Sequence, residues 1–430
     1  MTTLPAAPSA PDTAASGSAA RAWGAARSAD IAALAARHAE RFPWYGRLLD
    51  ARGVRGSGRL ADLPILGPEL LTEHYYTADH AHLPDASAYF TSGTATGLRK
   101  RILYSPADDD AYAAQRKALF QEFAGDLPAG SPAVADLGTG HAAASARRIF
   151  EEMGFRAHDI DFQLPIEQHV EKLNAWQPEL LFTMPMILDR LMRSPELAIA
   201  PRRIIVVGDL APENWRRQVA RHFGIGFGEV LDIFGSIEIG AIAHHDARTG
   251  LYHFHDHILP EVVPPQELYK DADAGSPAAG GGSGALLLTS FTRAYFPALR
   301  YVTGDVITGL QEITLDGRTV HAFQRIDGRL GGDFKHGERI SNHDVCAAMA
   351  EVFPRRPFEV ANDDGLRIRV VTDRVTDREL SAVRRLLREA APDVAQMIDS
   401  GLVGEIEVVA VPADGIRTDH AKRRFDVKEG

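Results

Sequence analysis

Repeated strand–turn–helix units in the middle of the chain constrain its fold more than any other feature. The clearest strand, RRIIVVGD (202–209), is rich in β-branched residues and ends at Gly208, and Pro212 then opens the helical pattern PENWRRQVARHF. Proline is favoured at a first helical position because its missing N–H has no partner there. The strands SPAVADLG (131–138) and PELLFTM (178–184) are each followed by a helical pattern in the same way. This alternation predicts an α/β fold with an at least partly parallel sheet, in which ligands bind beyond the carboxyl ends of the strands.

The last hundred residues have a separate pattern. LRIRVV (366–371) alternates like a half-exposed strand, and GEIEVVAV (404–411) predicts a second strand. Thr376 and Glu379 have the spacing of a capping box, which predicts the start of a helix between these two strands. We therefore expect a small α+β domain that joins the larger one near Gly328.

Length and composition limit the class of protein. A chain of 430 residues suggests two or three domains, and we expect a disordered tail over 1–22, a large domain over 23–328 and a small domain over 329–430. The net charge of −11 argues against a nucleic-acid-binding surface. No apolar run is long enough for a membrane span and no signal peptide is evident, so we expect a cytoplasmic protein. Cys346, the only cysteine, rules out an internal disulfide and favours a small buried residue of a helix.

The segment TSGTATGLRK (91–100) combines residue types that suit a polyphosphate. Glycines allow backbone N–H groups to turn inward, hydroxyl groups add donors, and cations neutralise charge. The pattern is not a P-loop, because its lysine and hydroxyl neighbours are misplaced. Taken alone, the segment is more often a polar turn between two strands.

Four later segments each place one candidate charged residue in a loop-like setting. They are LDIFGSIEIG with Glu238, FPALRYVTGD with Asp305, QRIDGRLGGDFKHGERI with Arg329 and RTDHAKRRFD with Lys422. Each has an ordinary alternative: a solvated acid, a tight turn between strands, a glycine-rich hinge and a charged tail. No single segment is specific for a function.

Taken in order, the five segments resemble the motifs of the adenylate-forming superfamily of acyl-CoA synthetases and adenylation domains. Those motifs are T-S-G-T-T-G-x-P-K, Y-G-x-T-E, R-Y-x-T-G-D, G-R-x-D and a late P-R-T-x-x-G-K. The segments RFPWYGRLLDARGV, ADLPILGPELL and GLYHFHDHILPEVV are similar to the phenylacetate–CoA ligase branch and to related enzymes of phenazine biosynthesis. The resemblance implies a large N-terminal mixed-sheet α/β domain of the acyl-CoA synthetase type and a small mobile α+β C-terminal domain.

The resemblance also implies roles for individual residues. A carboxylate would attack the α-phosphate of ATP, with Lys422 near the reacting groups and Glu238 as the ligand of Mg²⁺. Thr91, Ser92, Gly93, Thr94, Thr96, Gly97 and Lys100 would hold the β- and γ-phosphates. The rest of the implied nucleotide site comprises Gly208, Asp209, Phe234, Gly235, Ser236, Asp305 and Arg329, with Phe234 against adenine and Asp305 on the ribose. The implied acid pocket includes Gly138, His141, Met184 and Gly240.

The chain departs from the family pattern in ways that leave alternatives open. Ala95 lengthens the loop, Ile237 replaces a hydroxyl residue, and two glycines (331–332) replace an acid at the hinge. Lys422 and His420 both align with the late lysine, and we favour Lys422 because a permanent cation suits a phosphate better than an imidazole does.

A histidine cluster over residues 244–257 could hold zinc, since His253, His255 and His257 alternate along one strand. We favour solvated or substrate-facing histidines, because this spacing matches known zinc sites only loosely.

The leading functional hypothesis is ATP-dependent activation of a small aromatic carboxylic acid followed by transfer to CoA. The alternative within the same class passes the acyl group to an amine or to a carrier-protein thiol. A third hypothesis, from another class, is a non-catalytic nucleotide or ligand binder. Homodimers are common in the branch that the chain resembles.

Overall fold

The computed structural model describes residues 28–90, 100–138, 141–268, 282–330, 334–336, 338–361, 366–416 and 424–425. The described part begins with α2 (Ser28–Arg41) and α3 (Pro43–Ala51), followed by short helical segments at Leu60–Asp62, Pro68–Leu71 and Thr72–Tyr76. The predicted apolar phase of the first helix is confirmed, because Ile31, Leu34, Ala35 and His38 are buried. The hairpin of β1 (Ser87–Phe90) and β2 (Arg101–Tyr104) follows. The segment TSGTATGLRK, predicted to bind a polyphosphate, therefore lies in the chain between two antiparallel strands.

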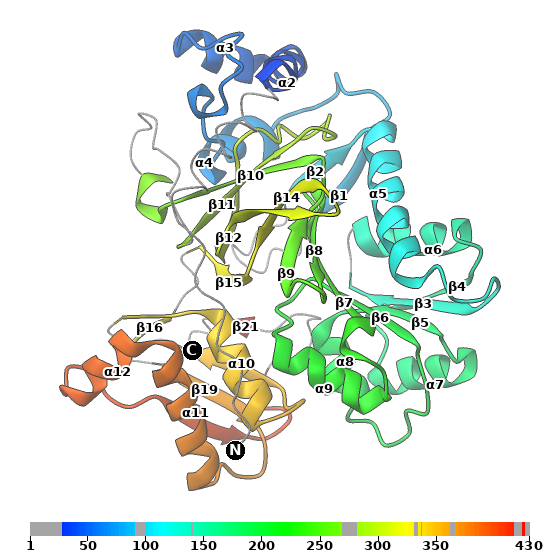
Figure 1. Ribbon diagram of the computed structural model, residues 1–430, viewed down its shortest axis with the longest axis vertical. Coiled ribbons are helices and arrows are strands. Elements are labelled where there is room, and N and C mark those ends of the chain that lie inside the picture. Colours follow the sequence, from blue (N-terminus) through cyan, green and yellow to red (C-terminus); the bar gives the residue numbers. More distant parts are fainter. Residues whose placement is uncertain are drawn as a thin grey trace.

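A nine-stranded mixed sheet forms the centre of the molecule, in the order β13-β14-β9-β8-β7-β6-β5-β3-β4 (Figure 1). Its parallel part comprises β3 (Pro132–Leu137), β4 (Arg156–Asp161), β5 (Leu180–Thr183), β6 (Arg203–Val207) and β7 (Val230–Ser236). The antiparallel part comprises β8 (Gly240–Asp246), β9 (Leu251–Phe254), β13 (Gln311–Leu315) and β14 (Arg318–Phe323). The predicted α/β class with a mixed sheet is confirmed.

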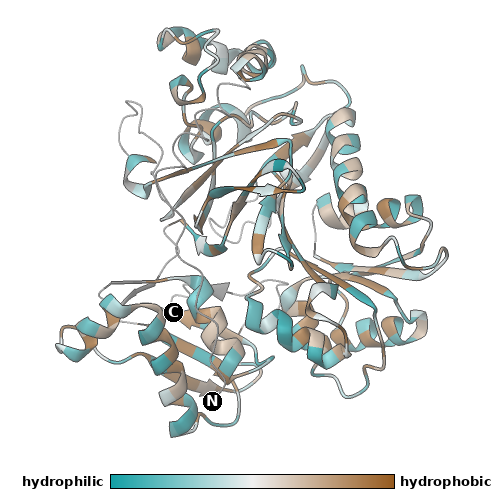
Figure 2. Ribbon diagram, viewed as in Figure 1, coloured by the Kyte–Doolittle hydropathy of each residue, from teal (hydrophilic) through white to brown (hydrophobic). Residues whose placement is uncertain are grey.

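Helices connect the parallel strands, as the sequence pattern predicts. They are α6 (His141–Glu152), α7 (Ile166–Trp176), α8 (Pro185–Leu191) and α9 (Glu213–Phe223) with the 3-10 turn at Phe227–Glu229, whereas α5 (Pro106–Ala124) leads from β2 into β3. Pro212 is the N-cap of α9, one residue before the position that the sequence suggests. Apolar residues gather on the strands and polar ones on the outer sides of the helices (Figure 2).

A second, antiparallel sheet has the order β10-β11-β12-β15. A 3-10 turn at Pro265–Leu268 lies between β10 and β11 in the chain. Its strands are β10 (Ile258–Val263), β11 (Ser283–Ser290), β12 (Tyr301–Thr308) and β15 (Arg325–Arg329). The expected turn at the T-G-D segment is wrong, because Asp305 lies inside β12. Gly304 has a φ of 78°. The register of β12 also shifts near this residue, both in its pairing with β11 and in its pairing with β15. A glycine-containing irregularity within the strand thus produces the sequence signal of a turn.

The C-terminal part has its own sheet and core. The strands β18 (Phe358–Ala361), β19 (Arg367–Val371), β20 (Glu407–Val411) and β21 (Arg424–Phe425) pair in the order β20-β19-β18-β21. They pack with α10 (Asn342–Val352), α11 (Asp377–Ala390) and α12 (Pro392–Asp399), after the short hairpin β16 (Phe334–His336) and β17 (Glu338–Ile340). The predicted capping box of Thr376 and Glu379 is confirmed. Cys346 is buried in α10, also as predicted.

The α10 helix lies beside α9 (Figure 1). Asn214 Nδ2 donates to the carbonyl of Ala347 at 2.8 Å, and Gln218 Nε2 donates to that of Ala350 at 2.6 Å. The proposed domain division at residue 328 stays a prediction, and it falls near the end of β15. Among the described residues, none of the helices has the length and apolar character needed to cross a membrane.

Burial of His38 gives a testable pH dependence of stability. Neither ring nitrogen has a hydrogen-bond partner, and burial, with help from Arg41 and Arg37, lowers the pKa of His38 to about 3. The folded state therefore favours the neutral ring, and this contribution is fully present above pH 6.5 and lost as the pH falls toward 3. In a His38→Phe variant the new ring can keep the stacking on Phe42. We expect its free energy of unfolding to fall less steeply with decreasing pH than that of the wild-type protein, by up to about 1.4 kcal/mol per pH unit.

The measurement is urea unfolding of both proteins at several pH values between 7 and 4. Parallel free-energy curves for the two proteins would contradict a neutral His38 in the folded state.

Candidate active site

Several predicted site residues lie at the carboxyl ends of adjacent parallel strands. Gly138 follows β3, Met184 follows β5, Gly208 follows β6 and Ser236 ends β7. These four strands are neighbours in the sheet, and the Gly138 N–H donates to Met184 Sδ at 3.2 Å. The predicted ligand edge of the sheet thus holds residues from four separate segments, as expected for open α/β sheets.

Backbone hydrogen bonds hold the β7–β8 turn that carries Glu238. Arg293 Nε donates to the carbonyl of Glu238 at 2.9 Å, and the Tyr104 hydroxyl donates to that of Ile237 at 2.7 Å. The carboxylate of Glu238 is half-buried. After burial itself, its charge is the largest influence that raises the pKa of Tyr76 and of Tyr301. Glu238 therefore lies beside these two phenols.

Asp305 and Arg329 form an ion pair between neighbouring strands. Their Cα atoms are register partners of β12 and β15, and Arg329 Nη1 donates to Asp305 Oδ1 at 2.8 Å. Asp305 is buried, whereas Arg329 is exposed. The Asp305 carboxylate raises the pKa of Arg329. A methyl group at Gly304 would lie 2.9 Å from Arg329 Nη2, so the guanidinium occupies the space that the missing side chain leaves.

Lys100 completes this group. Its Nζ lies 4.8 Å from the centroid of the Tyr76 ring, within cation–π distance. Glu238, Asp305 and Arg329 all act on the pKa of Tyr301. The tyrosine pair Tyr76 and Tyr301 thus brings together four predicted nucleotide-site residues from four distant segments.

Other predicted site residues lie outside the described residues. These are the loop residues Thr91, Ser92, Gly93, Thr94, Thr96 and Gly97, both candidates for the late lysine position, Lys422 and His420, and the hinge glycines. Phe234 packs on Phe323 with ring centroids 6.3 Å apart, and Asp209 Oδ1 accepts from the Leu210 N–H at 2.8 Å. The role of Phe234 at adenine stays a prediction.

His141 lies in a box of aromatic rings at the start of α6. The centroids of Tyr89, Tyr104 and Tyr112 lie 4.5, 4.3 and 4.0 Å from that of His141. His141 Nε2 donates to Asp109 Oδ1 at 2.8 Å, and burial lowers the pKa of His141 to about 4. So low a pKa makes His141 a weak base at neutral pH, which favours a lining role.

Gly240 adjoins the same aromatic box. A methyl group at this position would lie 3.0 Å from Tyr112 Cδ2. The structure therefore brings the two predicted pocket residues His141 and Gly240 to one tyrosine. Among the described residues, Gly138 and Met184 contact each other at the ends of β3 and β5.

The predicted row of histidines is present on β8, β9 and the residues after β9. His244 lies 5.9 Å from His253 and 5.5 Å from His255, and His255 lies 5.7 Å from His257, measured between ring centroids. His253 bonds to Thr249 Oγ1 and His257 to the carbonyl of Ala241. Within the described ranges, no group of three or more His, Cys, Asp or Glu residues is arranged to hold a metal ion.

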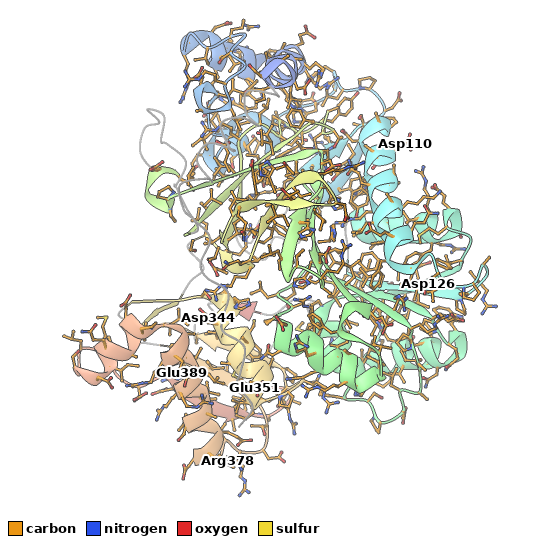
Figure 3. All side chains as sticks on the ribbon, in the orientation of Figure 1. Asp110, Asp126, Asp344, Glu351, Arg378 and Glu389 are labelled. Atoms are coloured by element: carbon orange, nitrogen blue, oxygen red, sulfur yellow. The ribbon has the colours of Figure 1, made fainter. Side chains whose placement is uncertain are left out.

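Sequence reasoning missed the partners that α5 contributes. Three consecutive aspartates point to different partners: Asp108 pairs with Arg293, Asp109 with His141 and Asp110 with Arg148. Asp110 lies on the outer side of the helix (Figure 3). Arg116 is buried beside the same aromatic box. Its spacing of four residues from Tyr112 and from Phe120, both buried, was the available signal that it lies on the inner face of the helix.

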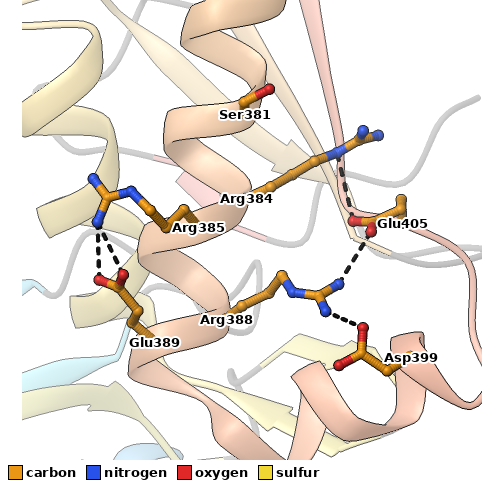
Figure 4. Close-up of a pocket in the computed structure, with 7 residues that line it drawn as sticks. All are labelled: Ser381, Arg384, Arg385, Arg388, Glu389, Asp399 and Glu405. Carbon is orange, nitrogen blue, oxygen red and sulfur yellow. Dashed lines mark hydrogen bonds and ion pairs between the residues drawn. The ribbon is translucent and has the colours of Figure 1, made fainter.

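A shallow hollow is lined by residues of α11, by Asp399 at the end of α12 and by Glu405 (Figure 4). Its charged side chains pair with one another: Arg385 with Glu389 at 2.9 Å, and Arg388 with both Glu405 and Asp399. Paired charges on a surface leave little reason for ligand binding.

Comparisons with known proteins place the chain among ligases. A family model described as the fumarate–diaminopropanoate ligase C-terminal domain matches residues 335–414. The fumarate–(S)-2,3-diaminopropanoate ligase of Enterobacter agglomerans is 46% identical over 385 residues, which cover 89% of this chain and 95% of that protein. The phenylacetate–coenzyme A ligase of Thermus thermophilus is 28% identical over 301 residues, which cover 65% of this chain and 64% of the relative.

A crystal structure of 2-hydroxyisobutyryl-CoA ligase in the postadenylation state, in complex with 2-HIB-AMP, has a similar fold. The TM-score is 0.71 at 17% identity, and the match covers 95% of this chain and 90% of the other. This likeness concerns the fold alone. Together with the 46% identity to a curated ligase, it confirms the resemblance found in the sequence: the chain belongs to the adenylate-forming ligases of the phenylacetate–CoA ligase-like branch, in the family of the fumarate–(S)-2,3-diaminopropanoate ligase.

Proposed function

We propose that this chain uses ATP to activate a carboxylic acid as its acyl-adenylate and then joins the acyl group to an amine. The observation that carries the proposal is the 46% identity to the fumarate–(S)-2,3-diaminopropanoate ligase across 89% of the chain. The proposed acid is a dicarboxylate of the fumarate type, and the proposed acceptor is a diamino acid. This revises the leading sequence hypothesis, which had an aromatic acid and CoA, and adopts its amine alternative.

In the first step, an oxygen of the substrate carboxylate forms a bond to the α-phosphorus of ATP, and pyrophosphate leaves. The reactants are both anionic, so the site must lower the charge between them. Lys100 and Arg329 bring two cations to the Tyr76–Tyr301 group. In the proposal, Asp305 binds the ribose hydroxyls, and its ion pair with Arg329 keeps the carboxylate in place.

The residues present fit a magnesium ion bound with the nucleotide. Mg²⁺ takes oxygen ligands and is commonly held by one or two carboxylates together with substrate phosphates. Glu238 offers one such carboxylate, on a half-buried residue of the β7–β8 turn. A bound ion would neutralise charge on the phosphates.

In the second step, the amine nitrogen forms a bond to the carbonyl carbon of the acyl-adenylate, the C–O bond to phosphate breaks, and AMP leaves. The nitrogen loses one proton as the amide forms. Burial keeps the imidazole of His141 neutral, so in the proposal this ring presents an uncharged, aromatic surface to the acyl group.

A two-stage assay tests the proposal. We expect pyrophosphate release from ATP with fumarate, and AMP release that increases on addition of (S)-2,3-diaminopropanoate but not of CoA, because the acceptor of the 46% identical relative is an amine. Mass spectrometry of the product should show the amide.

Each other outcome has a distinct meaning. A CoA thioester without amide would favour the acceptor of the phenylacetate–CoA ligase relatives. Absence of pyrophosphate release with every acid tested would favour the non-catalytic binder.

A further inference from the structure

Arg116 is a buried cation that lacks a counter-ion among the described residues. The residue is only 2% exposed, and its Nε and Nη1 have no hydrogen-bond partner. Removing a charge from water without a partner is costly, so such groups are normally paired. The unpaired guanidinium of Arg116 therefore needs an explanation.

Other buried arginines in the described part of the chain show what pairing looks like here. Arg293 lies 2.9 Å from Asp108, and Arg300 lies 3.1 Å from Glu261. Arg216 donates from Nε to the carbonyl of Ala211 at 3.1 Å. Asp109, two turns before Arg116 on the same helix, is engaged by His141. Arg116 thus differs from its buried counterparts in having nothing to neutralise it.

The surroundings of Arg116 belong to the candidate acid pocket. A methyl group at Gly235 would lie 2.5 Å from Arg116 Nη2 and 2.6 Å from the carbonyl of Gly240. The guanidinium carbon lies 5.5 Å from the centroid of Tyr112, a ring of the box around His141. Arg116 therefore lies against Gly235, which is packed on the carbonyl of Gly240 at the other end of the Glu238 turn.

Three histidines also lie within reach of the charge of Arg116. Its charge acts on His141, His244 and His255, and burial keeps the pKa of all three below the usual value. Neutral imidazoles, the Tyr112 ring and the backbone of Gly235 therefore surround Arg116, and none of these groups offers it a negative charge. A guanidinium binds a carboxylate through two parallel hydrogen bonds, which suits a planar acid end.

We propose that Arg116 binds the second carboxylate of a dicarboxylic acid substrate, while the first carboxylate lies on the Glu238 side and is activated. This inference rests on the proposed function and names the residue that selects its acid. The two ends of the substrate would then lie on either side of the β7–β8 turn. The pocket would favour a short, planar diacid over an acid with an uncharged end.

The test compares fumarate with its monomethyl ester and with crotonate in ATP–pyrophosphate exchange, which needs no acceptor. Wild-type protein should prefer fumarate. The R116M variant should lose roughly 100-fold in kcat/KM for fumarate, because a charged hydrogen-bonding partner is removed, and should retain or improve its use of crotonate. R116K should recover part of the preference for fumarate.

R216M is the matched control, since it removes a buried arginine that is bonded elsewhere. We expect R216M to change thermal stability without changing the order of acids. Thermal unfolding of R116M shows whether that variant is folded.

The outcomes separate this inference from the proposed function. A folded R116M that still prefers fumarate would overturn the role of Arg116 and leave the ligase proposal standing. Exchange by the wild-type protein with monocarboxylates alone would overturn both the role of Arg116 and the proposed dicarboxylate, and would leave ATP-dependent acid activation standing. Exchange with no acid at all would overturn both.

Discussion

A Glu238→Gln variant is expected to lose roughly 100- to 1,000-fold of the rate of ATP–pyrophosphate exchange, the magnitude usual for a group that stabilises developing charge. The amide keeps the shape of the side chain and removes its charge. The turn should stay intact, because it is held through the backbone carbonyls of Ile237 and Glu238. The effect should therefore appear in catalysis and in the concentration of Mg²⁺ needed, with little change in thermal stability.

Glu179→Gln is a suitable control for this experiment. Glu179 precedes β5, at the edge of the sheet opposite the candidate site, and its carboxylate pairs with Arg202 at 3.5 Å. The control variant should exchange pyrophosphate like the wild-type protein. Equal rates for the Glu238→Gln variant and the wild-type protein would contradict the role of Glu238 as a metal ligand.

The second large effect concerns the choice between Lys422 and His420. Lys422→Ala is expected to slow formation of the acyl-adenylate by roughly 100- to 1,000-fold, because a fixed cation is removed from the developing charge. His420→Ala should change the rate only a few fold, roughly the effect of a lost neutral hydrogen bond. The measurement is pyrophosphate exchange, followed by single-turnover formation of AMP with the amine.

Both residues lie outside the described residues, but the chain on either side belongs to the small sheet. Arg369 Nη2 donates to the carbonyl of Gly415 at 2.7 Å, and β21 pairs with β18. The opposite ranking, with His420→Ala as the slow variant, would assign the late-lysine position to His420. Unchanged rates for both would show that the family resemblance does not extend to this segment.

The local elements could be predicted from the sequence because their signals are local. The strand that ends at Gly208 and the capping box of Thr376 and Glu379 depend on residues within one or two turns of each other. The expected single strand with His253, His255 and His257 was right only in part, because β9 ends at Phe254 and the other two histidines follow it. Asp305 was misplaced because a glycine at a strand irregularity has the sequence pattern of a turn.

The amino-acid sequence by itself determined the fold class, the order of the motifs and the residue types that the site uses. Only the tertiary structure decided that Lys100, Glu238, Asp305 and Arg329 meet around Tyr76 and Tyr301, and that Arg116 lies unpaired against Gly235. The physical reason is that secondary structure follows short-range propensities and periodicity, whereas burial and pairing of a charge depend on residues far apart in the chain. The role of Arg116 therefore depends on the elements that pack around it and could not be read from its place on a helix.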